Sequence, residues 1–136
     1  MKIWQGYGSE HSANLVMIGH FKDVGDAKKA KDAIDLLKDQ VTTDERAGLM
    51  KIGEGSDRYT DSMLDLLGKV NVHSIGPAEL EQFAYDVAVE LKNDQVIIET
   101  EEIDVSAFLK VLVDKGARVE VYSAHTYPGT GHGRGK

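Results

Sequence analysis

Two passages of the chain repeat one order of elements, a short apolar strand followed by a capped amphipathic helix. In the first, the apolar run at residues 14–21 precedes a helix expected over about residues 24–39, with Asp23 as its N-cap. In the second, "QVIIETEE" precedes a helix capped by Asp104 and stopped by Gly116. Because each helix has one apolar stripe to bury, the repetition predicts helices packed on a sheet.

The spacing of apolar residues supports these assignments. In "QVIIETEE", Val96, Ile98 and Thr100 alternate with Ile97, Glu99 and Glu101, as expected for a strand. A final strand is expected in "ARVEVYSAH". The two helical stripes comprise Ala27, Ala30, Ile34 and Leu37, and then Val105, Phe108, Leu109, Leu112 and Val113.

A third helix is expected from Pro77 to Lys92, because the missing amide of proline costs nothing in a first helical turn. Residues 41–75 are ambiguous. "AGLMKIG" and "KVNVHSI" are compatible with short strands, and "SMLDLLG" with a brief helix closed by Gly68. The apolar stripe of the Pro77 helix comprises Leu80, Phe83, Ala84, Val87 and Leu91.

Two β-α-β passages in one small chain predict an α+β fold, with helices on one face of a mainly antiparallel sheet. The pattern resembles the ferredoxin-like split β-α-β sandwich with an elaborated middle segment. Residues 1–127 are expected to form a single domain, and residues 128–136 a flexible, glycine-rich tail. In the usual strand order of such a fold, the first and last strands lie side by side and antiparallel.

Composition and charge narrow the function classes. The chain has 136 residues, of which 41% are hydrophobic and 29% charged, with no cysteine. These values predict a globular protein without disulfides or thiol catalysis, and no apolar run is long enough for a membrane helix. A cytoplasmic location is the default expectation. The net charge of −7 argues against nucleic acid as a partner.

The negative charge is concentrated in one stretch. Residues 79–104 contain nine acidic residues and one basic residue, Lys92, for a net charge of −8. On the expected Pro77 helix, Glu79, Asp86 and Glu90 would line one flank, and the following strand would add Glu99 and Glu101. A surface of one sign attracts an oppositely charged partner, although it can also serve solubility alone.

Several stretches fall short of the functional motifs that they resemble. "GYGSEH" lacks the third glycine and the following helix of a dinucleotide site, and "GTGHGRGK" lacks the spacing of a phosphate loop. The acidic run from Glu99 to Asp104 has no calcium-loop spacing. No two of the five histidines stand at i and i+4. We therefore expect no cofactor and no metal.

One candidate site depends on the predicted topology. If the first and last strands are neighbours, "GYGSEHS" and "HTYPGTGHGRGK" share one end of the sheet, and Glu10, His11, His125 and Tyr127 converge. A histidine there could act as a general base, and glycine-rich backbone could hold an anion.

Two functional hypotheses follow. The first is a small acidic, non-catalytic protein of inhibitor, immunity or regulatory type. It would bind a basic protein through Glu79, Asp86, Glu90, Glu99 and Glu101, and it would also self-associate. The second is a small enzyme, or an anion- or metal-binding domain, with its site where the N-terminal loop and the C-terminal tail meet. The first requires fewer assumptions.

Overall fold

The computed structural model describes residues 14–51, 53, 58–85, 87–101, 104–123, 126–127 and 132–133. Its main sheet has four strands in the order β2-β3-β1-β4, and every neighbouring pair is antiparallel. The predicted α+β class is therefore confirmed. The predicted pairing of the first strand with the last strand of this sheet is confirmed as well. The strands are β1 (Asn14–His20), β2 (Ala88–Lys92), β3 (Gln95–Glu101) and β4 (Arg118–Ser123).

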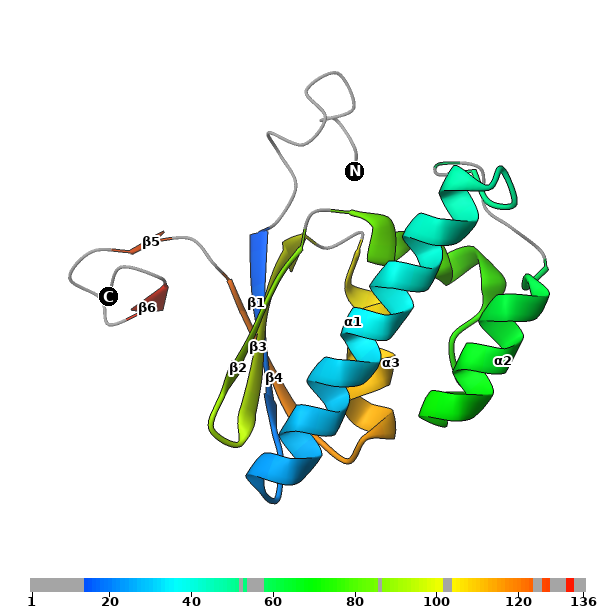
Figure 1. The fold of residues 1–136 in the computed structure, drawn as a ribbon. Coiled ribbons are helices and arrows are strands. Elements are labelled where there is room, and N and C mark those ends of the chain that lie inside the picture. Colours follow the sequence, from blue (N-terminus) through cyan, green and yellow to red (C-terminus); the bar gives the residue numbers. More distant parts are fainter. Residues whose placement is uncertain are drawn as a thin grey trace.

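The helices lie on one side of this sheet (Figure 1). α1 (Val24–Arg46) contacts β2 and β3, and α3 (Val105–Asp114) contacts β1 and β4. The 3-10 helix η2 (Pro77–Ala84) packs against both α1 and α3, while α2 (Asp61–Val70) packs against α1. No described helix covers the opposite side of the sheet, which we call the open face.

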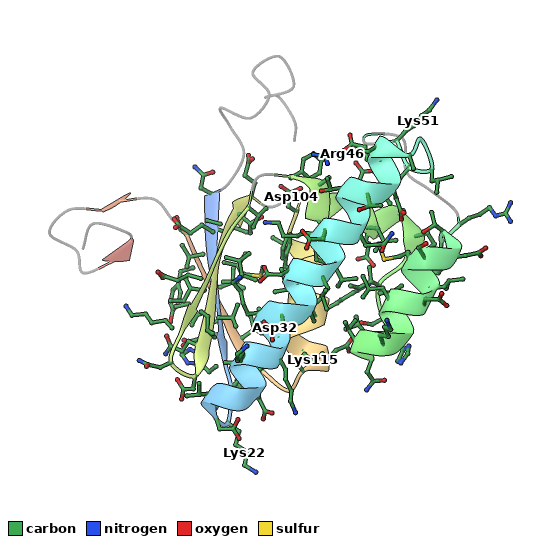
Figure 2. The ribbon with its side chains drawn as sticks, in the orientation of Figure 1. Lys22, Asp32, Arg46, Lys51, Asp104 and Lys115 are labelled. Atoms are coloured by element: carbon green, nitrogen blue, oxygen red, sulfur yellow. The ribbon has the colours of Figure 1, made fainter. Side chains whose placement is uncertain are left out.

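The core lies between the sheet and the helices, where Figure 2 shows the side chains filling the space. The predicted alternation of β3 is confirmed, because Val96, Ile98 and Thr100 are buried against the helices. Gly19 of β1 lets α3 approach closely. A Cβ atom at this position would lie 3.1 Å from Cδ2 of Leu112, closer than ordinary van der Waals contact.

The first helix begins as predicted and extends beyond the predicted end. The Asp23 carboxylate accepts a hydrogen bond from the amide of Asp26, at 2.9 Å. The helix then continues past residue 39 to Arg46, because Val41 and Asp44 are also buried. The Asp44 carboxylate accepts hydrogen bonds from Gln40 and Thr60, and Thr60 is the N-cap of α2. This contact joins the end of α1 to the start of α2.

The possible strands in residues 41–75 were wrong. Residues 47–51 form turns and irregular backbone, and residues 72–76 have no regular structure. The brief helix was correct in type, but it passes through Gly68 and ends at Val70. Its C-cap residue is Asn71, which takes the left-handed conformation with φ of 58°.

The helix predicted from Pro77 to Lys92 was also wrong in its second half. η2 ends at Ala84, and β2 follows from Ala88 to Lys92. Asn93 and Asp94 form a tight turn that joins β2 to β3, and Asn93 has a φ of 55°. β2 completes the hydrogen bonds along one side of β3, and this pairing outweighs the helical spacing of the apolar residues.

The predicted cap of α3 was correct in position but wrong in mechanism. Asp104 is the N-cap residue, yet its side chain makes no cap hydrogen bond. Instead, Oε1 of Gln82, on η2, accepts a hydrogen bond from the Ala107 amide at 2.8 Å. The labelled Asp104 lies at the end of the molecule where α1 finishes (Figure 2).

Two short strands, β5 (Thr126–Tyr127) and β6 (His132–Gly133), pair with each other in a separate two-stranded sheet. The flexible tail from residue 128 stays a prediction. Among the helices described, none is both long and apolar enough to cross a membrane.

Candidate binding surface

The structure brings together three of the five acidic residues predicted to bind a partner. Glu90 on β2 and Glu99 on β3 are exposed, Glu101 is partly exposed, and all three lie on the open face. Glu79 lies on η2, on the helical side of the sheet, and Asp86 lies outside the described residues. We call Glu90, Glu99 and Glu101 the acidic cluster.

The strand register defines the composition of the open face. Residues directly opposite each other in antiparallel strands point to the same face, and Met17, opposite Ile98, is fully buried beneath the helices. The neighbours of these residues along each strand therefore belong to the open face. These residues are Asn14, Val16, Ile18 and His20 on β1, Ala88, Glu90 and Lys92 on β2, Gln95, Ile97, Glu99 and Glu101 on β3, and Arg118, Glu120 and Tyr122 on β4.

The centre of the open face is apolar. Ile18 lies opposite Ile97, and Val16 lies beside Ile18 along the same face of β1. All three are partly exposed, and none belongs to the hydrophobic core on the helical side. Tyr122, opposite Val16, adds an aromatic ring that is 50% exposed. This surface can therefore offer apolar contact as well as charge.

A hydrogen-bonded group of side chains lies at one end of the open face. Nε2 of His20 is 2.6 Å from Oε1 of Glu120, and Gln95 donates to Nδ1 of His20 at 3.3 Å. These contacts fit the neutral ring with its proton on Nε2. The Tyr122 hydroxyl donates to Oε2 of Glu120 at 3.0 Å. A hollow in the surface is lined by His20, Arg118, Val119 and Glu120.

These contacts shift two proton equilibria. The hydrogen bond from His20, together with that from Tyr122 and the charge of nearby Arg118, lowers the pKa of Glu120 below its ordinary value. The hydrogen bond to Glu120 raises the pKa of Tyr122, because losing the proton would place two negative charges together. Glu120 therefore remains an anion at neutral pH. The group contains a histidine and a carboxylate, and its contacts within the sheet hold both in place.

Glu79 has a structural role in the described contacts. Its Oε1 accepts hydrogen bonds from Lys110 Nζ at 2.7 Å and from the Gly76 amide at 2.8 Å. Burial raises the pKa of Glu79, but the hydrogen bonds from Lys110, Gly76 and Ser106 outweigh it, so the net pKa is lowered. Its side chain is 21% exposed, and its charge is offset by Lys110. Glu79 therefore joins η2 to α3.

The candidate site at the chain ends lies mostly outside the described residues. Glu10, His11 and His125 are not described, and Tyr127 is described only through its backbone, which pairs with His132. Within the described strands, Leu15 pairs with Ser123. The start of β1 and the end of β4, from which these segments continue, are therefore adjacent. Whether the four side chains meet stays a prediction.

The described residues contain no group of three or more histidine, aspartate or glutamate side chains arranged to hold a metal ion. Glu99 and Glu101 share the open face, whereas Asp104 is buried at the start of α3 and Glu102 lies outside the described ranges. The acidic run in the sequence is thus divided between different sides of the sheet.

Sequence reasoning missed the β4 residues of the open face. The strand was predicted with Val119 and Val121 on one face, and the alternation that assigns them also places Arg118, Glu120 and Tyr122 opposite. The contact between His20 and Glu120 joins residues 100 positions apart. Only the register of β1 with β4 could have revealed it.

Together, the fold and this surface define a class of protein: a small α+β domain with one helix-covered sheet face and one open face that carries charge around an apolar centre. The chain belongs to DUF6375, a family of unknown function, whose family model matches residues 1–134. In comparisons with curated proteins and with solved structures, nothing matched the chain.

Proposed function

We propose that this chain is a small protein-binding domain that engages a basic polypeptide through the acidic cluster on its open face. The observation that carries the proposal is the convergence of Glu90, Glu99 and Glu101 from two neighbouring strands. Glu99 lies opposite Ala88, and Glu90 lies opposite Ile97, so each of these carboxylates has a small or apolar neighbour on the adjacent strand. Charge can then steer the partner, and apolar contact can hold it.

The acidic cluster differs from the other acidic residues nearby. Glu79 is held by Lys110, and Glu81 accepts hydrogen bonds from the Tyr85 hydroxyl and the Gly53 amide. Glu90 and Glu99 lie on the open face of the sheet and are more exposed than Glu79 and Glu81. A partner can approach them without rearranging the core.

The test is binding of a lysine- and arginine-rich synthetic peptide, measured by isothermal titration calorimetry at several salt concentrations. We expect affinity for the wild-type chain to fall as salt rises, because exposed charges are screened. The triple variant Glu90→Lys, Glu99→Lys, Glu101→Lys should lose binding. Salt-insensitive binding, or binding equal to wild type in the triple variant, would contradict the proposal.

A matched control changes the same amount of charge on the helical side. Asp39 and Glu45 are exposed on α1, and Asp65 is exposed on α2. Replacing these three residues with lysine gives the same net charge as the triple variant but leaves the open face intact. Peptide binding by this control should stay within about a factor of three of wild type, because distant exposed charges are largely screened.

For the fold, we propose the ferredoxin-like arrangement as the finer description. It is supported by the strand order β2-β3-β1-β4, by antiparallel pairing throughout, and by helices α1 and α3 in the two crossovers. In this description, α2 and η2 are an insertion between α1 and β2. A cytoplasmic location also remains a proposal.

A second candidate function is a histidine-containing site at the chain ends. The pairing of Leu15 with Ser123 supports it, because both flanking segments continue from one end of the sheet. The test is metal analysis of the purified protein together with NMR titration of His11 and His125. A bound metal, or a ring shift on addition of inorganic phosphate, supports this site. The absence of both a bound metal and a ring shift would count against it.

A further inference from the structure

The hollow at one end of the open face is bordered by side chains of opposite charge. It has a volume of about 350 Å³ and is lined by His20, Arg118, Val119 and Glu120. Arg118 and Glu120 point to the same face from β4, and Val119 lies between them along the strand. His20 lies opposite Arg118 on β1. The hollow therefore has a cationic group on one side and an anionic group on the other.

Glu120 is held in place by two neighbours and stays accessible to solvent. Nε2 of His20 lies 2.6 Å from its Oε1, and the Tyr122 hydroxyl donates to its Oε2 at 3.0 Å. Each carboxylate oxygen can accept a second hydrogen bond, and the side chain is 49% exposed. The hydrogen bond from His20 lowers the pKa of Glu120, so the group is an anion at neutral pH. Glu120 can therefore accept hydrogen bonds from a cationic group in the hollow.

Arg118 supplies the opposite charge, and its guanidinium is available to a ligand. Among the described residues, no hydrogen bond or ion pair involves Arg118, even though Glu120 stands on the same face of the same strand. The planar guanidinium has five donors in a fork that matches the two oxygens of a carboxylate. Arg118 can therefore bind a carboxylate in the hollow.

The other charges on the described open face lie further away. Glu90 and Lys92 are on β2, at the opposite edge of the sheet, so roughly 14 Å separates them from β4. Glu99 and Glu101 are on β3, two strands from β4, in cross-strand rows beyond that of Glu120. Exposed charges separated by more than about 8–10 Å are largely screened at physiological ionic strength. Local charge in the hollow is therefore set mainly by β4.

From this arrangement we propose that the hollow binds the zwitterion of a free α-amino acid, with the ligand carboxylate on Arg118 and its ammonium on Glu120. A ligand with negative charge alone would also face Glu120, and a ligand with positive charge alone would also face Arg118. A zwitterion places each of its charges beside one of opposite sign. This site goes beyond the proposed function, because it uses no residue of the acidic cluster.

The spacing of the two side chains favours a compact ligand. Residues two apart on an extended strand have Cα atoms roughly 6.7 Å apart. The two charged groups of an α-amino acid share one carbon atom, so a single small molecule can fill the space between the two protein groups. The hollow, at about 350 Å³, is within the size range of small-molecule sites and leaves room for a ligand side chain.

The test is an NMR titration of the full-length chain with L-alanine at neutral pH, following the amide of Val119 and the ring of His20. Acetate and methylammonium, which each carry one of the two charged groups, are titrated separately. We expect saturable shifts with L-alanine. Acetate and methylammonium should each bind at least about tenfold more weakly, because each makes only one of the two charge-assisted contacts.

Two variants assign the charges to their residues. Arg118→Gln and Glu120→Gln should each weaken L-alanine binding at least about tenfold, since each removes one charged contact. Arg118→Gln should also weaken acetate binding but not methylammonium binding, and Glu120→Gln should do the reverse. This crossed pattern distinguishes loss of a contact from loss of the fold, which the dispersion of the NMR spectrum checks independently.

Matched controls remove the same charges elsewhere. Lys92→Gln lies in the same cross-strand row as Arg118 but at the other edge of the sheet, and Asp39→Asn lies on α1. Both should bind L-alanine within about a factor of three of wild type, because distant exposed charges are screened. Three results would overturn the site: no saturable shift with L-alanine, acetate or methylammonium binding as tightly as L-alanine, or wild-type affinity in either β4 variant.

Discussion

The capping of α3 by Gln82 leads to a sharp prediction about stability. Gln82 lies on η2, and its side chain reaches the first turn of α3 at two points. Oε1 accepts from the Ala107 amide at 2.8 Å, and Nε2 donates to the Ser106 hydroxyl at 3.0 Å. The substitution Gln82→Ala removes both contacts and leaves the Ala107 amide without this acceptor. We expect it to destabilise the whole domain.

The magnitude follows from the burial of the affected amide. Loss of a side-chain helix cap costs about 0.5–2 kcal/mol, and leaving a buried donor without a partner costs about 1–3 kcal/mol. Ala107 is 0% exposed, so water has little access to replace the glutamine oxygen. We therefore expect a loss of about 2 kcal/mol in the free energy of unfolding, near the overlap of these ranges. For a chain of 136 residues, an unfolding entropy of about 290 cal/mol/K converts this to a drop in Tm of about 7 °C.

The assay is urea unfolding followed by circular dichroism, with thermal unfolding as a second measure. Gln82→Glu is the matched control, because it keeps an acceptor oxygen and places a negative charge near the start of a helix, where it is favoured. We expect the control to lie within about 1 kcal/mol of wild type, since it loses only the contact donated to Ser106. A Gln82→Ala variant as stable as wild type would refute the assignment of Gln82 as the cap.

Three further predictions concern the ion pair, the open face and the core. Lys110→Met should cost about 0.5–1.5 kcal/mol at neutral pH. The folded-state pKa of Glu79 is lowered, so this loss of stability should be complete at pH values above 4.5, the ordinary pKa of the group. The loss should shrink in acid unfolding curves as the pH falls through the folded-state pKa. A loss that does not depend on pH would contradict the ion pair. Glu120→Gln should lower the pKa of Tyr122 towards 10.0, measured by ultraviolet titration of tyrosinate against wild type, and an unchanged titration would contradict the hydrogen bond. Phe108→Ala should cost about 3–5 kcal/mol in urea unfolding, because the buried ring leaves a cavity; a loss below about 1 kcal/mol would contradict its place in the core.

Elements with a single clear periodicity could be predicted from the sequence. β3 alternates buried and accessible residues along its length, and Asp23 supplies the cap of α1 as expected. In both cases the determining contacts lie within the element or next to it in the chain. The end of α1 could not be predicted, because the burial of Asp44 depends on Thr60 of a later element.

Residues 77–92 show why a strong pattern can mislead. Leu80, Phe83 and Val87 fit a helical stripe and are all buried, but they reach the core from a 3-10 helix and an irregular segment. Val89 and Leu91 then alternate along β2, opposite Ile98 and Val96 of β3. The same apolar residues fit both the helical and the strand periodicity. Hydrogen bonding with β3 determines which of the two structures forms.

The sequence predicted part of the candidate surface. The correct residue assignments had different causes. Glu99 and Glu101 were assigned to one face correctly, because side chains alternate along a strand. Glu90 was grouped with them as part of a helix, yet it reaches the same face from β2. Glu79 was grouped with them as well, but Lys110, 31 positions away, holds it on the helical side.

The division of the acidic stretch follows from the sheet itself. A run of like charges in sequence becomes one surface only if its residues share a face. Here the run passes through a 3-10 helix, two strands and the start of α3, so its residues point to both sides of the sheet. The open face receives Glu90, Glu99 and Glu101, while the turn that separates β2 from β3 lies at the end near Lys92. Alternation along β2 also places Lys92 on the open face, and β4 contributes Arg118 at the same end. An overall charge of −7 therefore coexists with two basic residues, Lys92 and Arg118, at one end of the open face.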